Sequence, residues 1–163
     1  MIPVQVVLVP YMRTMLALSL INTHVGLILS YTAFFLPFSV YMLANFFRTI
    51  PRSLIEAAVC DGASSWSVFR RIVLPLSAAP LVTLAIVNLL WVWNELLIAL
   101  VFLQDDSKKT LMIGITSFQS RYSLNVPAIM SGLTLATLPI VTLYVFGQRF
   151  FVRGLVSGAV KGE

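Results

Sequence analysis

Residues 56–75 read EAAVCDGASSWSVFRRIVLP, a polar stretch that lies between long apolar segments. The flanking segments, 25–47 and 76–104, contain one charged residue between them, Glu95, and a later segment, 126–148, contains none. A helix needs roughly 20 apolar residues to cross the hydrocarbon core of a bilayer. Each segment is long enough, so the sequence predicts an all-α membrane protein with three full spans.

The composition of the whole chain excludes an ordinary water-soluble domain. Of its 163 residues, 59% are hydrophobic and 10% are charged, and the mean hydropathy is +0.94. Soluble domains usually carry about 25% charged residues. This chain therefore lacks the polar surface that a globule in water would need.

The first residues predict a partial span over 1–12. Arg13 interrupts the apolar stretch, and a helix of this length reaches only about 18 Å. No basic region precedes it, so it does not fit a signal peptide. We expect the chain to begin inside a transmembrane helix, as a fragment or a shortened form of a longer protein.

The cationic residues predict the orientation, because lysine and arginine favour the cytoplasmic side of a membrane. The loop between the first two full spans and the segment 149–163 carry most of them: Arg48, Arg52, Arg70, Arg71, Arg149, Arg153 and Lys161. The other side carries Arg13, Lys108, Lys109 and Arg121. We expect a membrane protein whose 51–75 loop and C-terminal tail are cytoplasmic. The cations are scattered over span ends, so nucleic-acid binding is not expected.

No motif for catalysis or metal binding is found. One cysteine, Cys60, excludes an intrachain disulfide and a cysteine-based metal cluster. The one histidine, His24, lies at the outer end of a span and is read as a polar anchor. The chain contains no phosphate-binding G-x-x-x-x-G-K-[ST] pattern. We predict a protein that is not an enzyme and needs no cofactor or metal.

The polar loop predicts two short helices with a tight corner between them. Ser53 and Glu56 have the spacing of a capping box, just after Pro51. Gly62 is placed to end the first helix in a left-handed conformation. Ser64 or Ser65 can cap a second helix that begins near residue 66, and Pro75 is expected to stop it.

Both predicted helices of the loop expose an apolar face unless something covers it. From the residues alone, two interpretations remain open: an amphipathic loop that rests on lipid headgroups, and a helix that docks into a groove of a soluble partner. The apolar faces consist of Leu54, Ile55, Ala58 and Val59 on the first helix, and Trp66, Phe69, Ile72 and Val73 on the second.

The spacing of the loop residues follows the pattern E-A-A-x3-G-x9-I-x-L-P at Glu56, Ala57, Ala58, Gly62, Ile72, Leu74 and Pro75. This resembles the EAA loop of the membrane subunits of binding-protein-dependent ABC importers. The segments GLILSYTAFFLPFSVYMLANFFRTIP, LWVWNELLIALVFLQD and GLTLATLPIVTLYVFGQRFFVRGLVSGAVKG resemble spans and the tail of the maltose-type, MalG-like carbohydrate permeases. The resemblance covers the later part of that family's transmembrane domain.

The resemblance implies the function of a permease subunit in a type I importer. Its partners would be a second permease subunit, two ATPase subunits and an extracytoplasmic solute-binding protein, with a sugar as the solute and membrane lipid around the spans. ATP hydrolysis would belong to the separate ATPase. The loop residues that would couple to it are Glu56, Ala57, Ala58, Asp61, Gly62, Ile72, Leu74 and Pro75.

The segment 88–95, NLLWVWNE, is the most polar part of a predicted span. Asn88, Trp91 and Glu95 are expected on one helical face, with Asn94 beside them. A carboxylate at membrane depth should face a cavity or a partner. Either Trp91 and Trp93 belong to an interfacial aromatic belt, with Glu95 near enough to the outer boundary to meet water, or the segment lines a polar pathway. In such a pathway, tryptophan would stack on a sugar ring, and Asn or Glu would accept hydrogen bonds from its hydroxyls. Gln119 and Tyr122 are weaker candidates.

Two classes of function remain open from the sequence. The first is the permease subunit of a carbohydrate importer. The second is a membrane scaffold that binds an ATPase without passing solute, as a truncated permease would. Within transport, the solute could instead be an amino acid or an inorganic anion.

Overall fold

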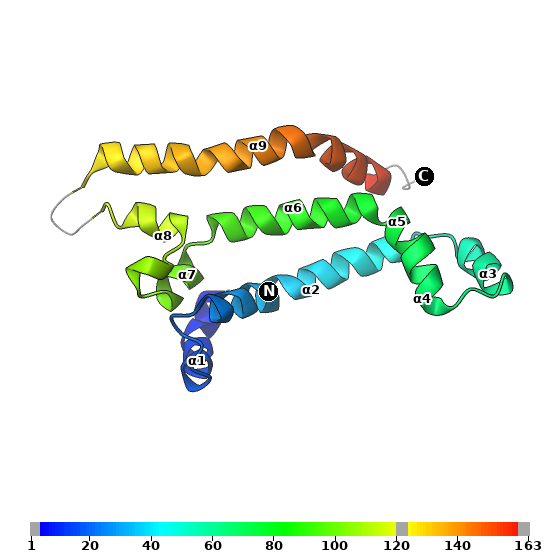
Figure 1. Ribbon diagram of the computed structural model, residues 1–163, viewed down its shortest axis with the longest axis horizontal. Coiled ribbons are helices and arrows are strands. Elements are labelled where there is room, and N and C mark those ends of the chain that lie inside the picture. The colour runs from blue at the N-terminus through cyan, green and yellow to red at the C-terminus, as the bar shows by residue number, and fades with distance from the viewer. Residues whose placement is uncertain (1–3, 120–123, 160–163) are drawn as a thin grey trace. The chain divides into compact units, whose positions relative to one another are not determined.

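The computed structural model describes residues 4–119 and 124–159, and within these ranges every named element is a helix. One isolated antiparallel bridge joins Gln119 and Leu124. The all-α class predicted from the apolar segments is therefore confirmed. The helices run in the order α1 Val4–Ala17, α2 His24–Phe47, α3 Arg52–Cys60, α4 Ser65–Val68, π-helix η1 Phe69–Val73, α5 Leu74–Leu76, α6 Ala78–Asn94, α7 Leu97–Phe102, 3-10 helix η2 Asp106–Lys108, α8 Leu111–Thr116 and α9 Val126–Ala159 (Figure 1).

Two helices are long and apolar enough to cross a membrane. Helix α2 spans His24–Phe47, and the apolar part of α9 spans Val126–Gly147. Both lie where the uncharged segments 25–47 and 126–148 predicted them. Helix α9 continues past this apolar part to Ala159, so much of the predicted tail 149–163 extends the same helix, and residues 160–163 lie outside the described part.

The third predicted span, 76–104, is not one continuous helix in the structure. Helix α6 ends at Asn94, and a separate short helix, α7, follows after Glu95 and Leu96. At its other end, α6 meets the helical segment Ser65–Leu76 at a bend of 69°. If this bent pair counts as one span, the described residues hold up to three spans.

The chain divides into two compact units, and α2, α6 and α9 each contribute to both. One unit consists of Met1–Phe34 and Leu90–Val141, and the other of Phe35–Leu89 and Thr142–Glu163. The core of the first unit is formed by buried residues of α1, α2, α7 and α8 with the segments beside them: Met15, Leu27, Ile98, Ala99, Phe102, Leu103 and Ile113.

The N-terminal helix packs into this core through an aromatic contact. Tyr11 lies edge-on to Phe34 of α2, with ring centroids 5.4 Å apart, and 5.6 Å from the ring of Phe102. Helix α1 extends to Ala17 and includes Arg13, whose side chain is exposed. The helix thus runs past the residue at which the predicted segment 1–12 was expected to end.

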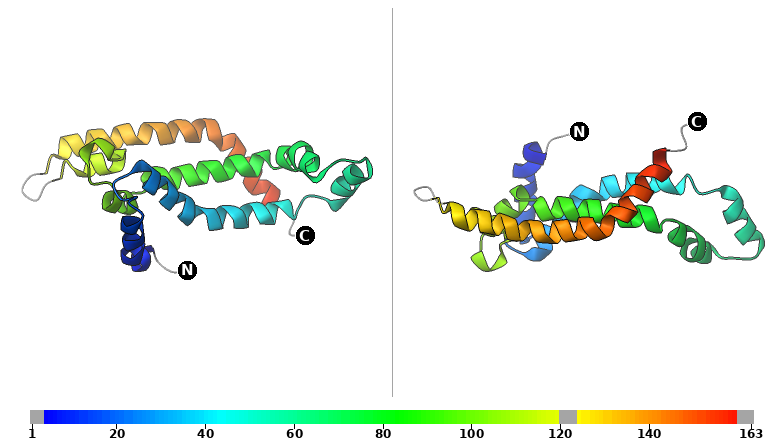
Figure 2. Two further views of the ribbon diagram at one scale, coloured as in Figure 1. Left: turned by 60° about the horizontal axis from the view of Figure 1, so that its bottom comes forward. Right: turned by 90° about the horizontal axis from the view of Figure 1, so that it is seen from above.

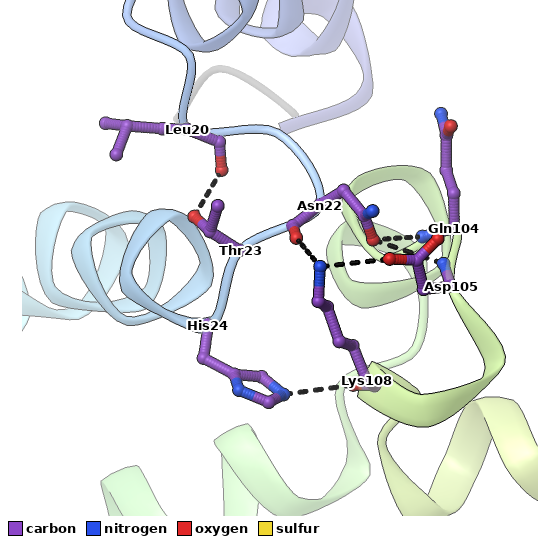
Figure 3. A network of polar contacts seen from close by, with 7 residues as sticks. All are labelled: Leu20, Asn22, Thr23, His24, Gln104, Asp105 and Lys108. Carbon is purple, nitrogen blue, oxygen red and sulfur yellow. Dashed lines mark hydrogen bonds and ion pairs between the residues drawn. The ribbon is translucent and has the colours of Figure 1, made fainter.

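A polar network closes one end of this unit by joining the segment before α2 to the segment after α7 (Figure 3). Asn22 adopts a left-handed conformation with φ of 60°. Its Oδ1 accepts hydrogen bonds from the backbone N–H groups of Gln104 and Asp105, both at 3.1 Å. Its backbone N–H donates to the carbonyl of Phe102 at 2.8 Å. Asn22 therefore supplies hydrogen-bond partners to backbone groups that have no partner inside a helix.

Lys108 completes the network with its charge. The Lys108 ammonium donates to the carbonyl of Asn22 and to the carboxylate of Asp105, each at 2.9 Å (Figure 3). The pKa of Asp105 is lowered below its ordinary value, mainly by the hydrogen bond from the Lys108 ammonium. A side-chain hydrogen bond with Asn22 and the positive charge of Lys108 lower it further. His24 lies beside the same segment, with its Nε2 3.2 Å from the carbonyl oxygen of Lys108.

Substitution of Gly26 by alanine should destabilise the first unit. Gly26 is buried at the start of α2, and a Cβ there would overlap the backbone carbonyl oxygen of Leu20. We expect Gly26→Ala to lower the free energy of unfolding in detergent micelles by about 1–3 kcal/mol. Gly114→Ala is the matched control, because a Cβ at Gly114 meets nothing within 4 Å. Equal stability of the two variants would contradict the close approach.

The lowered pKa of Asp105 predicts how stability depends on pH. An aspartate whose pKa is lowered in the folded state contributes its full stabilisation of the fold at pH values above its unfolded pKa of about 4. That stabilisation is lost as the pH falls through the lower, folded-state pKa. We expect acid titration of unfolding in micelles to show this loss, and Lys108→Met to reduce it. An unchanged acid profile in the Lys108→Met variant would show that the network does not act on Asp105.

Candidate functional site

The loop between α2 and α6 begins with helix α3, which starts two residues earlier than a capping box at Ser53 requires. Pro51 is the N-cap, with φ of −59° and ψ of 126°, and no side chain caps the helix. The carbonyl of Pro51 accepts the first hydrogen bond, from the N–H of Leu54 at 3.2 Å. Because Ser53 already lies inside the helix, the predicted capping box is wrong.

Helix α3 ends in the glycine corner that the sequence predicted. Gly62 has a φ of +79°, a conformation that side-chain-bearing residues rarely adopt. The N–H of Gly62 donates to the carbonyl of Val59, and the N–H of Ala63 donates to the carbonyl of Ala58, both at 2.9 Å. These two bonds form a Schellman motif, which satisfies carbonyls that the helix end would otherwise leave unpaired. The corner between the two helices is therefore fixed by backbone geometry.

The second helical segment of the loop is capped as predicted but does not stop at Pro75. The Ser64 hydroxyl accepts a hydrogen bond from the N–H of Ser67 at 3.3 Å. After α4, the backbone widens into the π-helix η1, in which the N–H of Leu74 donates to the carbonyl of Phe69. This places Pro75 in the first turn of α5, where a missing N–H is tolerated.

The bend that separates the loop from α6 lies at Ser77. The Ser77 side chain is fully buried, and its hydroxyl donates to the carbonyl of Val73 at 2.6 Å. Its backbone N–H also reaches the carbonyls of Val73 and Leu74, at 3.0 and 3.2 Å. A serine that bonds back to the preceding turn commonly bends a helix. No sequence expectation was attached to this serine.

The loop presents exposed apolar side chains, as the sequence predicted. Trp66 is 69% exposed and stacks on Phe69, with ring centroids 5.6 Å apart. On α3, Leu54 and Val59 are also exposed. Helices α3 and α4 lie side by side (Figures 1 and 2). Such a surface is suited to burial against a partner.

A hollow of about 650 Å³ lies between the two helices of the loop and contains four of the eight predicted coupling residues. Ala58, Asp61, Gly62 and Ile72 line it, together with Ala63, Ser64, Ser67, Val68 and Arg71. Glu56, Ala57, Leu74 and Pro75 are exposed elsewhere on the loop. Arg71 was not among the predicted coupling residues. The signal in the sequence that could have pointed to Arg71 was its place in the pair of adjacent arginines, Arg70 and Arg71.

The polar residues of α6 do not form one group. Asn88 donates from Nδ2 to the hydroxyl of Ser39 on α2 at 3.0 Å. Its Oδ1 is buried and has no hydrogen-bond partner among the described residues. Ser39 was missed by the sequence analysis, since a lone serine in an apolar span gives no signal of its partner. Asn88 is therefore the residue of this helix with an unused buried acceptor.

The other predicted pathway residues lie in the first unit. Trp91 is 56% exposed, and the exposed Asn94 donates to the carbonyl of Leu90 at 2.7 Å. The indole N–H of Trp93 donates to the carbonyl of Ala136 on α9 at 3.1 Å. Gln119 is exposed, and Tyr122 lies outside the described residues.

Glu95 lies beyond the end of α6, so the expected helical face that it shares with Asn88 and Trp91 is not formed by a single helix. Its carboxylate accepts a hydrogen bond from the Tyr31 hydroxyl at 2.9 Å. It also accepts the backbone N–H groups of Ile98 at 2.8 Å and Ala99 at 3.0 Å. The carboxylate is therefore occupied by three donors of the same unit.

No metal site is formed by the described residues, in which no three His, Cys, Asp or Glu side chains gather. Cys60 is exposed at the end of α3.

Comparison with known proteins identifies what the chain resembles. Residues 1–157 match the family described as "Binding-protein-dependent transport system inner membrane component". The chain is 43% identical to a putative ABC transporter permease protein, ORF2, of Caldicellulosiruptor, over 99% of this chain and 58% of that protein. It is 36% identical to the melibiose/raffinose/stachyose import permease protein MelC of Bacillus subtilis, over 99% of this chain and 59% of that protein. It is 35% identical to the arabinooligosaccharides transport system permease protein AraQ of Halalkalibacterium halodurans, over 99% and 57%. The chain spans somewhat more than half the length of these relatives.

Proposed function

The chain belongs to the family of binding-protein-dependent transport system inner membrane components, and on that premise we propose that it is a permease subunit of an ATP-driven carbohydrate importer. It is a multi-pass membrane protein, with α2 and α9 as its long apolar helices. The proposal for a carbohydrate is supported by relatives named for the import of melibiose, raffinose and stachyose, and of arabinooligosaccharides.

The observation that carries the proposal is the geometry of the 51–75 loop. Two short helices meet at the Schellman corner of Gly62, and Trp66 and Phe69 expose a stacked apolar pair. A lever that transmits motion must be stiff and must be joined to the spans it moves. The loop suits both demands, because η1 and α5 continue from α4 to Leu76, and α6 begins directly after Ser77. We place this loop against an ATPase subunit in the cytoplasm.

The proposed orientation follows the distribution of lysine and arginine, with the loop and the C-terminal segment in the cytoplasm. The proposed partners are the ATPase pair, a second permease subunit and an extracytoplasmic solute-binding protein. A second permease subunit is included because α2 and α9 expose large apolar side chains, among them Tyr41 and Phe146. Lipid and neighbouring helices can both cover such surfaces.

For the solute pathway, we propose the exposed and polar part of α6. Trp91 is 56% exposed, and an indole is suited to stacking on a sugar ring. Asn88 offers a buried carbonyl oxygen without a partner, and Asn94 is exposed. Glu95 follows directly after Asn94. We propose that Glu95 contributes both to the shape and to the polarity of this region.

Reconstituted transport tests the proposed function. The chain, within its full-length protein, is placed in liposomes with its partner permease, ATPase subunits and binding protein. We expect ATP-dependent uptake of a labelled oligosaccharide and no uptake of amino acids or inorganic anions. Uptake of those solutes instead would reject the carbohydrate assignment, and ATPase binding without uptake of any solute would favour a non-transporting scaffold.

Substitutions at Gly62 test the coupling role of the loop. Gly62→Pro removes the N–H that bonds Val59 and forbids the positive φ, so we expect at least a tenfold loss of uptake with normal membrane insertion. Gly62→Asn is the matched control, since asparagine tolerates the left-handed conformation, and it should retain most uptake. ATPase co-purification and uptake at wild-type levels in Gly62→Pro would count against the coupling role.

A further inference from the structure

The helix break between α6 and α7 has no glycine or proline to explain it. Residues 90–100 read LWVWNELLIAL, and such a leucine-rich sequence without glycine or proline usually continues a helix. A new helix nevertheless begins at Leu97, with Leu96 as its N-cap at φ of −118° and ψ of −38°. Each helix start leaves backbone N–H groups without a partner inside the helix. In an apolar protein, such unpaired groups are costly.

Leucine cannot cap a helix, so another residue must supply the acceptor. The Glu95 carboxylate takes this role from the position before the N-cap, since Oε1 accepts the N–H of Ile98 and Oε2 that of Ala99. These are the second and third residues of α7, the positions that a cap side chain normally serves. The negative charge also lies at the positive end of the new helix.

The same carboxylate ties α7 to α2. Its Oε2 accepts the hydrogen bond of the Tyr31 hydroxyl at 2.9 Å. Tyr31 itself packs against the core cluster that contains Ile98, Ala99 and Phe102. The Glu95 side chain thus connects the end of α6, the start of α7 and Tyr31 in the N-terminal half of α2.

We propose that Glu95 is a positioning residue that fixes the break between α6 and α7 and so sets the placement of Trp91 and Asn94. The three donors occupy most of the acceptor capacity of the carboxylate. A solute that drew the carboxylate away would leave the N–H groups of Ile98 and Ala99 without their acceptor. Glu95 therefore acts on the solute through the shape of the helix break.

Amide exchange provides the direct test. We compare hydrogen–deuterium exchange of the peptide that contains residues 96–103 in wild-type protein, Glu95→Leu and Tyr31→Phe, all in detergent micelles. Glu95→Leu should speed exchange at Ile98 and Ala99 roughly tenfold, the size of a lost helix cap. Tyr31→Phe is the matched control, because it removes only the phenolic hydroxyl and leaves the hydrogen bonds from the N–H groups of Ile98 and Ala99 to Glu95. Exchange in this variant should therefore stay near the wild-type rate.

A second-site rescue separates a cap from a ligand. Leu96 occupies the N-cap position, where serine can accept the N–H of the second or third helical residue. We expect Leu96→Ser, added to Glu95→Leu, to restore slow exchange. Wild-type exchange in Glu95→Leu, or failure of Leu96→Ser to restore it while the helix content is normal, would overturn the inference.

Transport supplies a further readout, which rests on the proposed function. In the reconstituted importer, Glu95→Leu should lower the maximal uptake rate and leave the KM for solute within about twofold, and Leu96→Ser should recover the rate. A raised KM that Leu96→Ser does not correct would show that Glu95 binds solute directly. If no carbohydrate is imported at all, the exchange results still decide the positioning role.

Discussion

Every interruption of a helix in this apolar chain must find partners for its backbone N–H and C=O groups, and the rest of the structure depends on this constraint. Lipid offers no hydrogen bonds, and an unpaired buried group costs on the order of several kcal/mol. The chain meets the demand with a few short polar devices. Asn22 serves the segment after α7, Gly62 closes α3, Ser77 bonds back to Val73, and Glu95 starts α7.

These devices also explain why so few polar residues suffice to shape the molecule. Each lies at the end or the break of a helix, and each makes hydrogen bonds with backbone groups, either next to it in the chain or, for Asn22, in the segment after α7. The apolar side chains between them are left to face lipid or partner subunits. Two features are not explained by this constraint: the exposed stack of Trp66 on Phe69, and the buried, unpartnered Oδ1 of Asn88. They are the features that the proposed importer uses, one for docking and one for solute.

The loop between α2 and α6 shows how a local conformation can serve a mechanical role. Its corner is defined by two backbone hydrogen bonds and one left-handed glycine, so it does not rely on packing from the rest of the chain. The π-helix η1 then carries the chain past Pro75 to the buried hydroxyl of Ser77. Force applied to α4 would pass through η1 and α5, which follow α4 without a break, and would reach α6 at a defined 69° bend.

The sequence by itself determined the all-α class, the positions of α2 and of the apolar part of α9, the left-handed corner at Gly62 and the cap at Ser64. These follow from hydrophobic length and from the local preferences of single residues. The roles of Ser53, Pro75 and Glu95 were decided by tertiary structure. Ser53 does not cap α3, because Pro51 is already the N-cap of that helix. The π-helix η1 places Pro75 in the first turn of α5, where its missing N–H is tolerated. The Glu95 carboxylate caps α7 and also accepts the hydroxyl of Tyr31, 64 residues earlier, and a pattern of neighbouring residues holds no information about a partner so distant along the chain.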